Sequence, residues 1–311
     1  MLTILLGILE EGLVYAIMAL GVYITYKILD FPDLSVDGTF PLGAALTAAG
    51  IANGLPFVGK ISPIAALFIS FFVGALAGCC TGLIHVKLKV RDLLSGIIVM
   101  TALYSINLRI AGKANLPIFS QETIFANEFL EKQVPEALKP YTVALILLLI
   151  VAVCKVLLDL YLKTRSGYLL RAVGDNDVLV TSLAKDKGMV KIVGLAIANG
   201  FAALAGSVYC QQKGFFEIST GTGLANVIIG TQLFKRFGFV KGTTAVIAGS
   251  IIYKACVSLA LNLGGQYRQG DYIVSIPITA SDLKLITSIL FLVILLASTD
   301  RRKKVKSHAH Q

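Results

Sequence analysis

Charged side chains are scarce in this 311-residue sequence. They make up 15% of residues, whereas soluble domains carry about a quarter. Acidic residues are the scarcer sign, with 18 Asp and Glu against 28 Lys and Arg. The mean hydropathy is +0.80, and several apolar runs exceed the roughly 20 residues that cross a bilayer. These features exclude a soluble domain and predict an all-α polytopic membrane protein.

Histidine and cysteine are too few and too scattered to form a metal or catalytic cluster. The three histidines are His85, His308 and His310. The five cysteines all fall in expected spans, and an odd number inside helices argues against a disulfide framework. We therefore expect small buried cysteines, no metal site and no cofactor bound by this chain.

Nucleic-acid binding is not expected, although the formal net charge is +10. Most Lys and Arg residues fall in segments that would face the cytoplasm, as the positive-inside rule requires. The densest group, Arg301 to Lys306, indicates an anchor at anionic lipid headgroups. We expect a plasma (inner) membrane protein with a cytoplasmic C-terminus. Glu10 and Glu11 in the first run favour an external N-terminus or a water-lined position, and no cleavable signal peptide is expected.

About nine crossings are predicted, in a single transmembrane domain that covers residues 1–311. The expected spans are Leu2–Ile28, Leu34–Ala52, Ile64–Val86, Leu93–Ile110, Tyr141–Leu162, Ile192–Gln212, Leu224–Phe234, Thr243–Leu263 and Leu283–Ala297. The longest outer segment, residues 112–139, carries mixed charge that is typical of an external surface. It could receive a substrate-delivering protein or be a plain solvated loop.

The second span is predicted to be broken. Polar and helix-breaking residues fill Leu29 to Gly43, directly before an apolar stretch. Irregular backbone at membrane depth is tolerated only where it is buried in protein or lines a cavity. We expect a broken span from Leu34 to Ala52 that lines a translocation path with Asp37, Gly38 and Phe40. The alternative is a cytoplasmic loop followed by a short helix.

Polar residues in three other spans are further candidates for the path. Asn107 and Arg109 lie near the outer end of the fourth span, where they could meet a substrate carboxylate; Arg109 could instead extend to the headgroups. Asn199 lies inside the sixth span. Lys254, near the middle of its span, is costly unless paired or hydrated, and both a path role and a helix interface stay open.

A ridge of small residues indicates close helix packing. Gly74, Gly78 and Gly82 recur every four residues and share one helix face. The ridge is compatible with packing inside the chain or with the seam of a dimer.

Residues 163–188 form the one substantial polar stretch in the second half of the chain. Its basic side chains are Lys163, Arg165, Arg171, Lys185 and Lys187. Tyr168 to Val173 predicts a short amphipathic helix, and Val178 to Lys185 a second one, with Gly188 as its C-terminal glycine. A helix pair too polar for the bilayer should lie on the cytoplasmic surface and dock a soluble partner. A structured basic loop is the alternative.

An ATP site is not expected in this chain. Gly54 to Lys60 fits G-x-x-x-x-G-K, but Ile61 follows where a phosphate-binding loop needs Ser or Thr for magnesium. Membrane spans flank the motif in place of a soluble strand. We therefore expect a transport subunit and not an enzyme.

Three motifs resemble the permease subunits of ATP-driven (ABC) importers of the branched-chain amino acid and ribose type. RSGYLLRAVGDNDVLVTSLAKDKG, with the FAALAGSV that follows, resembles their cytoplasmic coupling segment. DLSVDGTF, residues 33–40, resembles the opening of the second span in the sugar members. LLSGIIVMTALYSINLRIAGKANLP resembles a subgroup tied to uptake of amino acids, of aromatic type. The similarity covers nearly the whole chain.

The resemblance implies a type II importer: two permeases, two cytoplasmic ATPases and an extracytoplasmic binding protein. This chain would import a small polar solute, most of all an amino acid, as one of two identical copies. ATP and magnesium would be bound by the ATPase. The residues that would form the coupling helix are Gly167, Leu170, Arg171, Ala172, Gly174 and Asp175. The motif departs from branched-chain members at residues 174–176, which leaves the substrate class open.

Three other functions are weighed against this one. A sugar or nucleoside importer permease would share the same fold. An ion-driven secondary transporter could use Asp37 and Lys254, although no paired repeats occur. A membrane-embedded enzyme would depend on Asp30, Asp33 and Asp37, which lack a companion histidine.

Overall fold

The computed structural model describes residues 2–55, 59–136, 138–175, 186–218, 241–262, 266–269 and 272–275. The expected crossings at 224–234 and 283–297, and the expected helix at 178–185, lie outside these ranges.

Five described helices are long and apolar enough to cross a membrane, and they correspond to five of the nine predicted spans. The first combines α1 (Leu2–Tyr23) with a π-helical turn, η1 (Ile24–Ile28). The others are α3 (Pro63–Lys87), α4 (Asp92–Ala111), α6 (Lys139–Tyr161) and α9 (Lys187–Lys213). Helix α11 (Gly242–Asn262) contributes a shorter apolar stretch.

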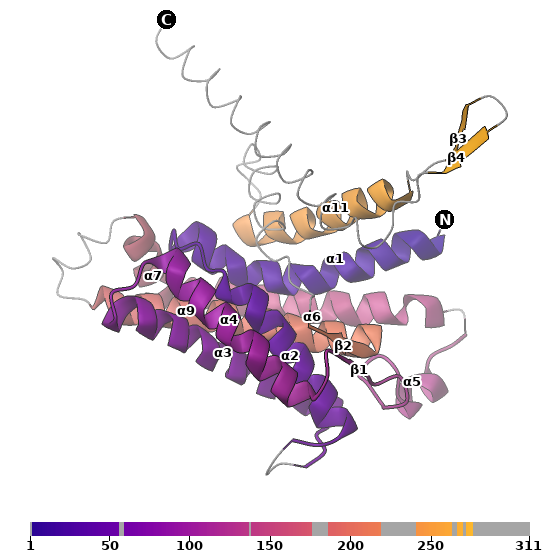
Figure 1. Cartoon of the computed structure of the whole chain (residues 1–311), viewed down its shortest axis with the longest axis horizontal. Coiled ribbons are helices and arrows are strands. Elements are labelled where there is room, and N and C mark those ends of the chain that lie inside the picture. The colour runs from indigo at the N-terminus through magenta and orange to yellow at the C-terminus, as the bar shows by residue number, and fades with distance from the viewer. Residues whose placement is uncertain are drawn as a thin grey trace, which may run out of the picture.

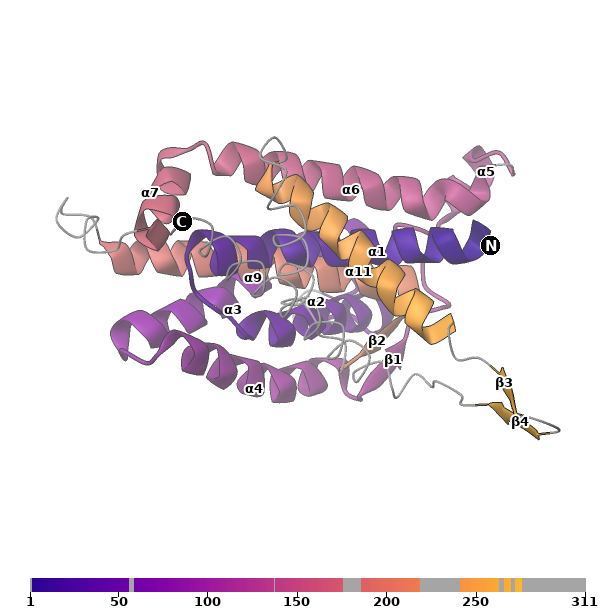
Figure 2. The same cartoon turned by 90° about the horizontal axis from the view of Figure 1, so that it is seen from above.

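The long helices lie side by side along the longest axis of the molecule (Figures 1 and 2). Helix α7 (Arg165–Asp175) lies at one end, where it contacts α9; the turn from α3 to α4 lies at the same end. The N-terminus and helix α5 (Glu128–Gln133) lie at the other end. We refer below to the α7 end and the opposite end.

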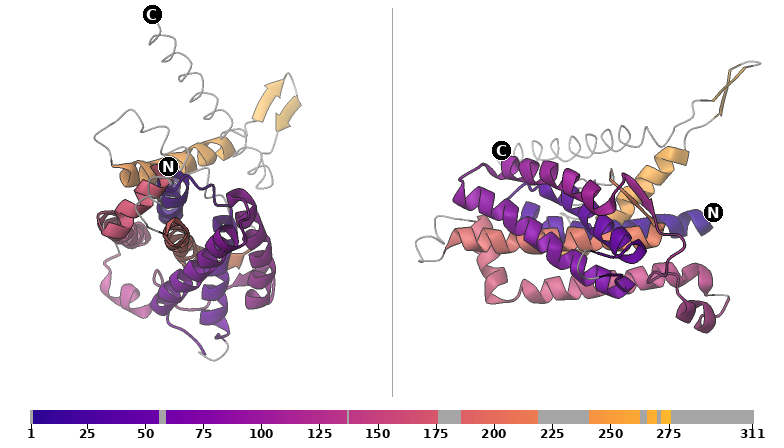
Figure 3. Two further views of the ribbon diagram at one scale, coloured as in Figure 1. Left: turned by 90° about the vertical axis from the view of Figure 1, so that its left-hand side faces the viewer. Right: turned by 60° about the horizontal axis from the view of Figure 1, so that its bottom comes forward.

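Helix α2 (Ser35–Ala52) is the most enclosed element, and it corrects one prediction. It runs as one continuous helix although Pro41 lies inside it, so the span is not broken between residues 35 and 52. The irregular backbone precedes it, at residues 29–34, and is largely buried. Helices α3, α4 and α9 pack around α2 (Figure 3), and this enclosure offsets the hydrogen bond that the proline removes.

The glycine ridge of α3 packs against α9 and not at the surface. A Cβ atom at Gly74 would overlap Ala203, one at Gly78 would overlap the Leu195 carbonyl oxygen, and one at Gly82 would lie 2.8 Å from Ile192. Because all three glycines are buried against the same helix, the ridge serves packing inside the chain and is not available as a dimer seam.

Short strands join the helices at the opposite end. Strand β1 (Asn115–Pro117) pairs antiparallel with β2 (Phe215–Glu217), with Leu116 opposite Phe216. Both of these apolar side chains are buried. Strands β3 (Gln266–Gln269) and β4 (Tyr272–Ser275) form a second antiparallel pair. Within residues 112–136 the chain therefore forms a strand and the short helix α5, with Leu116 and Ile118 buried.

Candidate functional site

Helix α7 is the amphipathic helix that the sequence predicted in the polar stretch. It begins earlier and ends later than Tyr168 to Val173, at Arg165 and Asp175. Gly167, Leu170 and Val173 are buried at a spacing of three residues, which gives the helix one apolar face.

Two glycines seat α7 close to neighbouring backbone. A Cβ atom at Gly174 would overlap the Ile28 carbonyl oxygen at the end of η1. One at Gly167 would lie 2.5 Å from the Cα atom of Leu162, just after α6. Leu170 is fully buried, where it lies next to Gly194 of α9. Helix α7 is thus held against three elements and would move with them as one unit.

The outward face of α7 carries charge and one aromatic ring. Arg165, Tyr168, Arg171 and Asp175 are exposed, and the Tyr168 side chain is 58% accessible. Of the predicted coupling residues, Gly167, Leu170 and Gly174 seat the helix, Ala172 is half-buried, and Arg171 and Asp175 face outward. Exposed tyrosine and arginine side chains are typical of protein–protein interfaces.

The end of the polar stretch differs from the prediction. Gly188 does not end a helix: it is the second residue of α9, buried against Val86. The Asp186 carboxylate accepts hydrogen bonds from the backbone N–H groups of Gly188, at 2.8 Å, and Met189, at 3.3 Å. An N-cap therefore stands where a C-terminal glycine was expected, because capping carboxylates satisfy the unpaired N–H groups of a helix start.

A buried polar cluster joins the start of α2 to α9. The Asn199 side chain donates from Nδ2 to Oδ2 of Asp33 at 2.8 Å, and its Oδ1 accepts from the Thr39 hydroxyl at 2.6 Å. Ser35 donates to Oδ1 of Asp33 from its hydroxyl, at 2.6 Å, and from its backbone N–H, at 2.8 Å. All four side chains are at most 1% exposed.

The predicted path residues do not converge on one surface. Gly38 and Asn107 meet, since the Asn107 side chain donates to the Gly38 carbonyl at 3.0 Å. Phe40 is fully buried elsewhere, in a stack with Tyr15 at a centroid distance of 5.6 Å. Arg109 is exposed on α4, whereas Asp37 is half-buried on α2.

The Asn107 amide leaves one buried group unmatched. Within the described part of the chain its Oδ1 atom has no hydrogen-bond partner. The side chain is 1% exposed, so this acceptor lies between α2 and α4 and away from bulk solvent.

Lys254 is paired across a helix interface. Its Nζ atom lies 3.3 Å from Oε2 of Glu11 and 4.0 Å from the centre of the Tyr15 ring. Lys213 at the end of α9 pairs with the same carboxylate, so Glu11 ties α1 to both α9 and α11. Sequence spacing placed these residues in different spans, and only two adjacent glutamates in an apolar run signalled that cations should lie nearby.

Comparison with known proteins finds a matching family. Residues 4–298 match the model of the family described as branched-chain amino acid transport system / permease component. The tyrosine transport system permease protein of Clostridioides difficile (strain R20291) is 44% identical over 296 residues, which is 94% of this chain and 90% of that protein.

Two further similarities are weaker. The uncharacterized protein RP368 of Rickettsia prowazekii (strain Madrid E) is 33% identical over 85% of this chain and 91% of its own length. The autoinducer 2 import system permease protein LsrC of Salmonella typhimurium is 36% identical over 90 residues, 29% of this chain and 26% of that protein. No solved structure matches the chain significantly.

Proposed function

The chain belongs to the family of branched-chain amino acid transport system permease components, and from this premise we propose that it carries tyrosine or a related aromatic amino acid. It is the membrane permease of an ATP-driven importer for an amino acid. The observation that carries the substrate is the 44% identity, along nearly the whole chain, to a tyrosine transport system permease protein.

Helix α7 docks a separate cytoplasmic ATPase in this proposal. Its support is an exposed basic face on a helix whose buried glycines fix it to η1 and α6. ATP and magnesium bind to the partner, and this chain holds no cofactor of its own. When two docked ATPases close, α7 moves with α9 and η1. This movement of α7 switches the helices between inward-facing and outward-facing arrangements.

The α7 end lies in the cytoplasm in this arrangement, and the N-terminus lies outside. The support is the concentration of basic residues on segments at that end, such as Lys87, Lys89, Arg91 and Lys163. A single domain that covers residues 1–311 crosses the membrane about nine times. Because the N-terminus lies outside, the C-terminus then lies in the cytoplasm. The opposite end, capped by β1 and β2, then receives an extracytoplasmic binding protein.

The exposed face of α4 borders the translocation path, together with a second copy of this chain. Thr101, Tyr104, Ser105 and Arg109 are exposed on a helix that spans the membrane. Polar side chains in a span usually face protein or a water-filled cavity and not lipid. Asn107, on the buried side of the same helix, brings its unmatched Oδ1 next to Gly38. The path is then backed by a second layer of residues that do not line it directly: Asp37, Phe40 and Asn199.

Transport by the whole complex tests the substrate. The chain, its ATPase and its binding protein are reconstituted in liposomes, and uptake of labelled tyrosine, leucine and ribose is followed with ATP. We expect tyrosine uptake well above the other two, and none with an ATPase whose Walker lysine is replaced. Ribose uptake without amino acid uptake contradicts the proposal, as does ion-driven uptake by the permease alone.

A further inference from the structure

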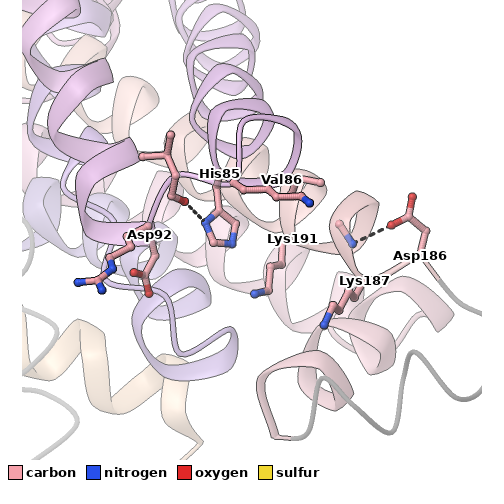
Figure 4. Close-up of a pocket in the computed structure, with 10 residues that line it drawn as sticks. His85, Val86, Asp92, Asp186, Lys187 and Lys191 are labelled. Atoms are coloured by element: carbon pink, nitrogen blue, oxygen red, sulfur yellow. Dashed lines mark hydrogen bonds between the residues drawn. The ribbon is translucent and has the colours of Figure 1, made fainter.

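A cavity of about 600 Å³ opens at the α7 end of the molecule (Figure 4). Its walls come from the last turn of α3, the turn that leads into α4, and the first turns of α9. It lies at the same end of the molecule as α7, but no residue of α7 lines it, so the coupling proposal leaves this cavity unexplained.

Basic side chains dominate the lining. The cationic ones are Lys89, Arg91, Lys187 and Lys191, and the acidic ones are Asp92 and Asp186. Asp186 is already used as the N-cap of α9. Within the described residues, Lys89, Arg91 and Lys191 form no ion pair with a carboxylate. The charges of Lys89, Arg91 and Lys191 are therefore not neutralised by an ion pair within the described residues.

The turn that presents Lys89 is fixed in an unfavourable backbone conformation. Lys89 has a φ of +54°, in the left-handed region that glycine or asparagine adopts more readily. The His85 ring donates from Nδ1 to the Val90 carbonyl at 2.9 Å, which holds this turn against the end of α3. A lysine thus occupies a position where its backbone preference alone would not place it.

Exposed apolar side chains lie close in the sequence to the charged lining residues. Leu83, Leu88, Leu93, Leu94 and Met189 are between 44% and 70% exposed. They flank the lining residues along α3, α4 and α9, at ends of helices long enough to span the membrane. Such side chains are stable next to lipid tails and costly next to water.

We propose that this cavity binds the phosphate of an anionic glycerophospholipid, whose acyl chains lie against the exposed leucines. Cations above an apolar rim, at the level where a span ends, match the two parts of such a lipid. A cytoplasmic protein would match the charge but would leave the leucine rim unexplained. The bound lipid would join the α3–α4 turn to α9, the helix on which α7 rests.

Lipid retention by the purified full-length permease tests the proposal. Native mass spectrometry follows phosphatidylglycerol and phosphatidylcholine that stay bound to the wild type, to a Lys89→Asn/Lys191→Gln double variant, and to Lys163→Gln. Asparagine is used at position 89 because it tolerates the left-handed backbone. Lys163 is a matched control, since it is exposed at the same end of the molecule but outside the cavity.

We expect the double variant to lose affinity for phosphatidylglycerol by about fivefold for each cation removed. Phosphatidylcholine should bind weakly to all forms, Lys163→Gln should behave as the wild type, and Lys191→Arg should retain the lipid. A melting curve confirms that each variant is folded.

Four results would overturn the proposal. These are unchanged retention in the double variant, equal loss in Lys163→Gln, equal binding of both lipids, and displacement of the lipid by inorganic phosphate at equal concentration. The last would indicate a site for a free anion. If the double variant lost the co-purified ATPase but kept the lipid, the cavity would be a protein-docking site instead.

Discussion

A single asparagine holds together a fully buried cluster of polar side chains. Asn199 satisfies both the carboxylate of Asp33 and the hydroxyl of Thr39 with one side chain. A buried carboxylate that loses a donor keeps its desolvation cost without the hydrogen bond that offset it. Asn199 therefore fixes where α2 begins against α9.

Removing the Asn199 amide should lower the stability of the protein more than removing a neutral buried hydroxyl. We expect Asn199→Ala to lower stability by about 2–3 kcal/mol, because a hydrogen bond to a charged group is lost. Ser207→Ala, which removes a buried hydroxyl pair with Thr47, is the control at about 1 kcal/mol. Melting temperatures of the purified variants, measured in the same detergent, show which of the two substitutions lowers stability more. Equal melting temperatures would mean that Asp33 is neutral or finds another donor.

The pair between Glu11 and Lys254 should couple more strongly than a surface pair. Glu11→Gln leaves Lys254, with a side chain 13% exposed, without its carboxylate, whereas adding Lys254→Met removes the unmatched charge. We expect a coupling of about 1 kcal/mol in a double-mutant cycle of melting temperatures. The same cycle at Glu128 and Lys132, both about three-quarters exposed, should give near zero. Equal coupling in the two cycles would contradict the buried pairing.

At the scale of elements, α7 has two faces with separate tasks. Its glycines and Leu170 set its position, and its exposed residues are free to meet a partner. Changes on the exposed face should alter docking and leave folding intact, whereas changes on the buried face should alter both.

Arg171→Glu is expected to abolish transport and weaken ATPase docking, with insertion into the membrane intact. The charge reversal places an acidic group where the partner meets a cation, at the cost of several kcal/mol if the contact is closely matched. Lys113→Glu makes the same reversal on an exposed residue at the opposite end, which the ATPase does not reach, and should leave ATPase co-purification unchanged. Co-purification of the ATPase and its transport-coupled activity are the measurements; unchanged coupling in Arg171→Glu would refute the docking role.

At the scale of the whole molecule, the two ends must face opposite sides of the membrane. The helices lie side by side with α7 at one end and α5 at the other, so one orientation fixes the exposure of both (Figure 1). The placement of the ATPase, the binding protein and the lipid cavity all depend on this orientation.

Cysteine labelling tests the orientation directly. In inside-out vesicles, an impermeant maleimide should label Tyr168→Cys strongly and Glu128→Cys weakly, above the background of the five native cysteines. Whole cells should give the reverse pattern. Labelling of Tyr168→Cys from outside would place α7 where no cytoplasmic ATPase can reach it.

Much of the fold followed from local patterns in the chain. Apolar run length predicted the spans that became α1, α3, α4, α6 and α9, because backbone groups in lipid must be paired within a helix. The amphipathic spacing in the polar stretch predicted α7, and the motifs of that stretch indicated the importer family. The same local reasoning overestimated the effect of Pro41, because the packing of α3, α4 and α9 around α2 offsets the backbone hydrogen bond that the proline removes.

Only the tertiary structure shows which faces of the spans pack against one another. Spacing alone could not say whether the glycine ridge of α3 faces α9 or another molecule, because the ridge is the same in both cases. Nor could it bring Glu11 to Lys254, or Asp33 to Asn199, which lie 166 positions apart in the chain. Composition and periodicity set which segments become helices, whereas pairing between distant polar groups depends on which faces meet, and only the packed bundle fixes those faces.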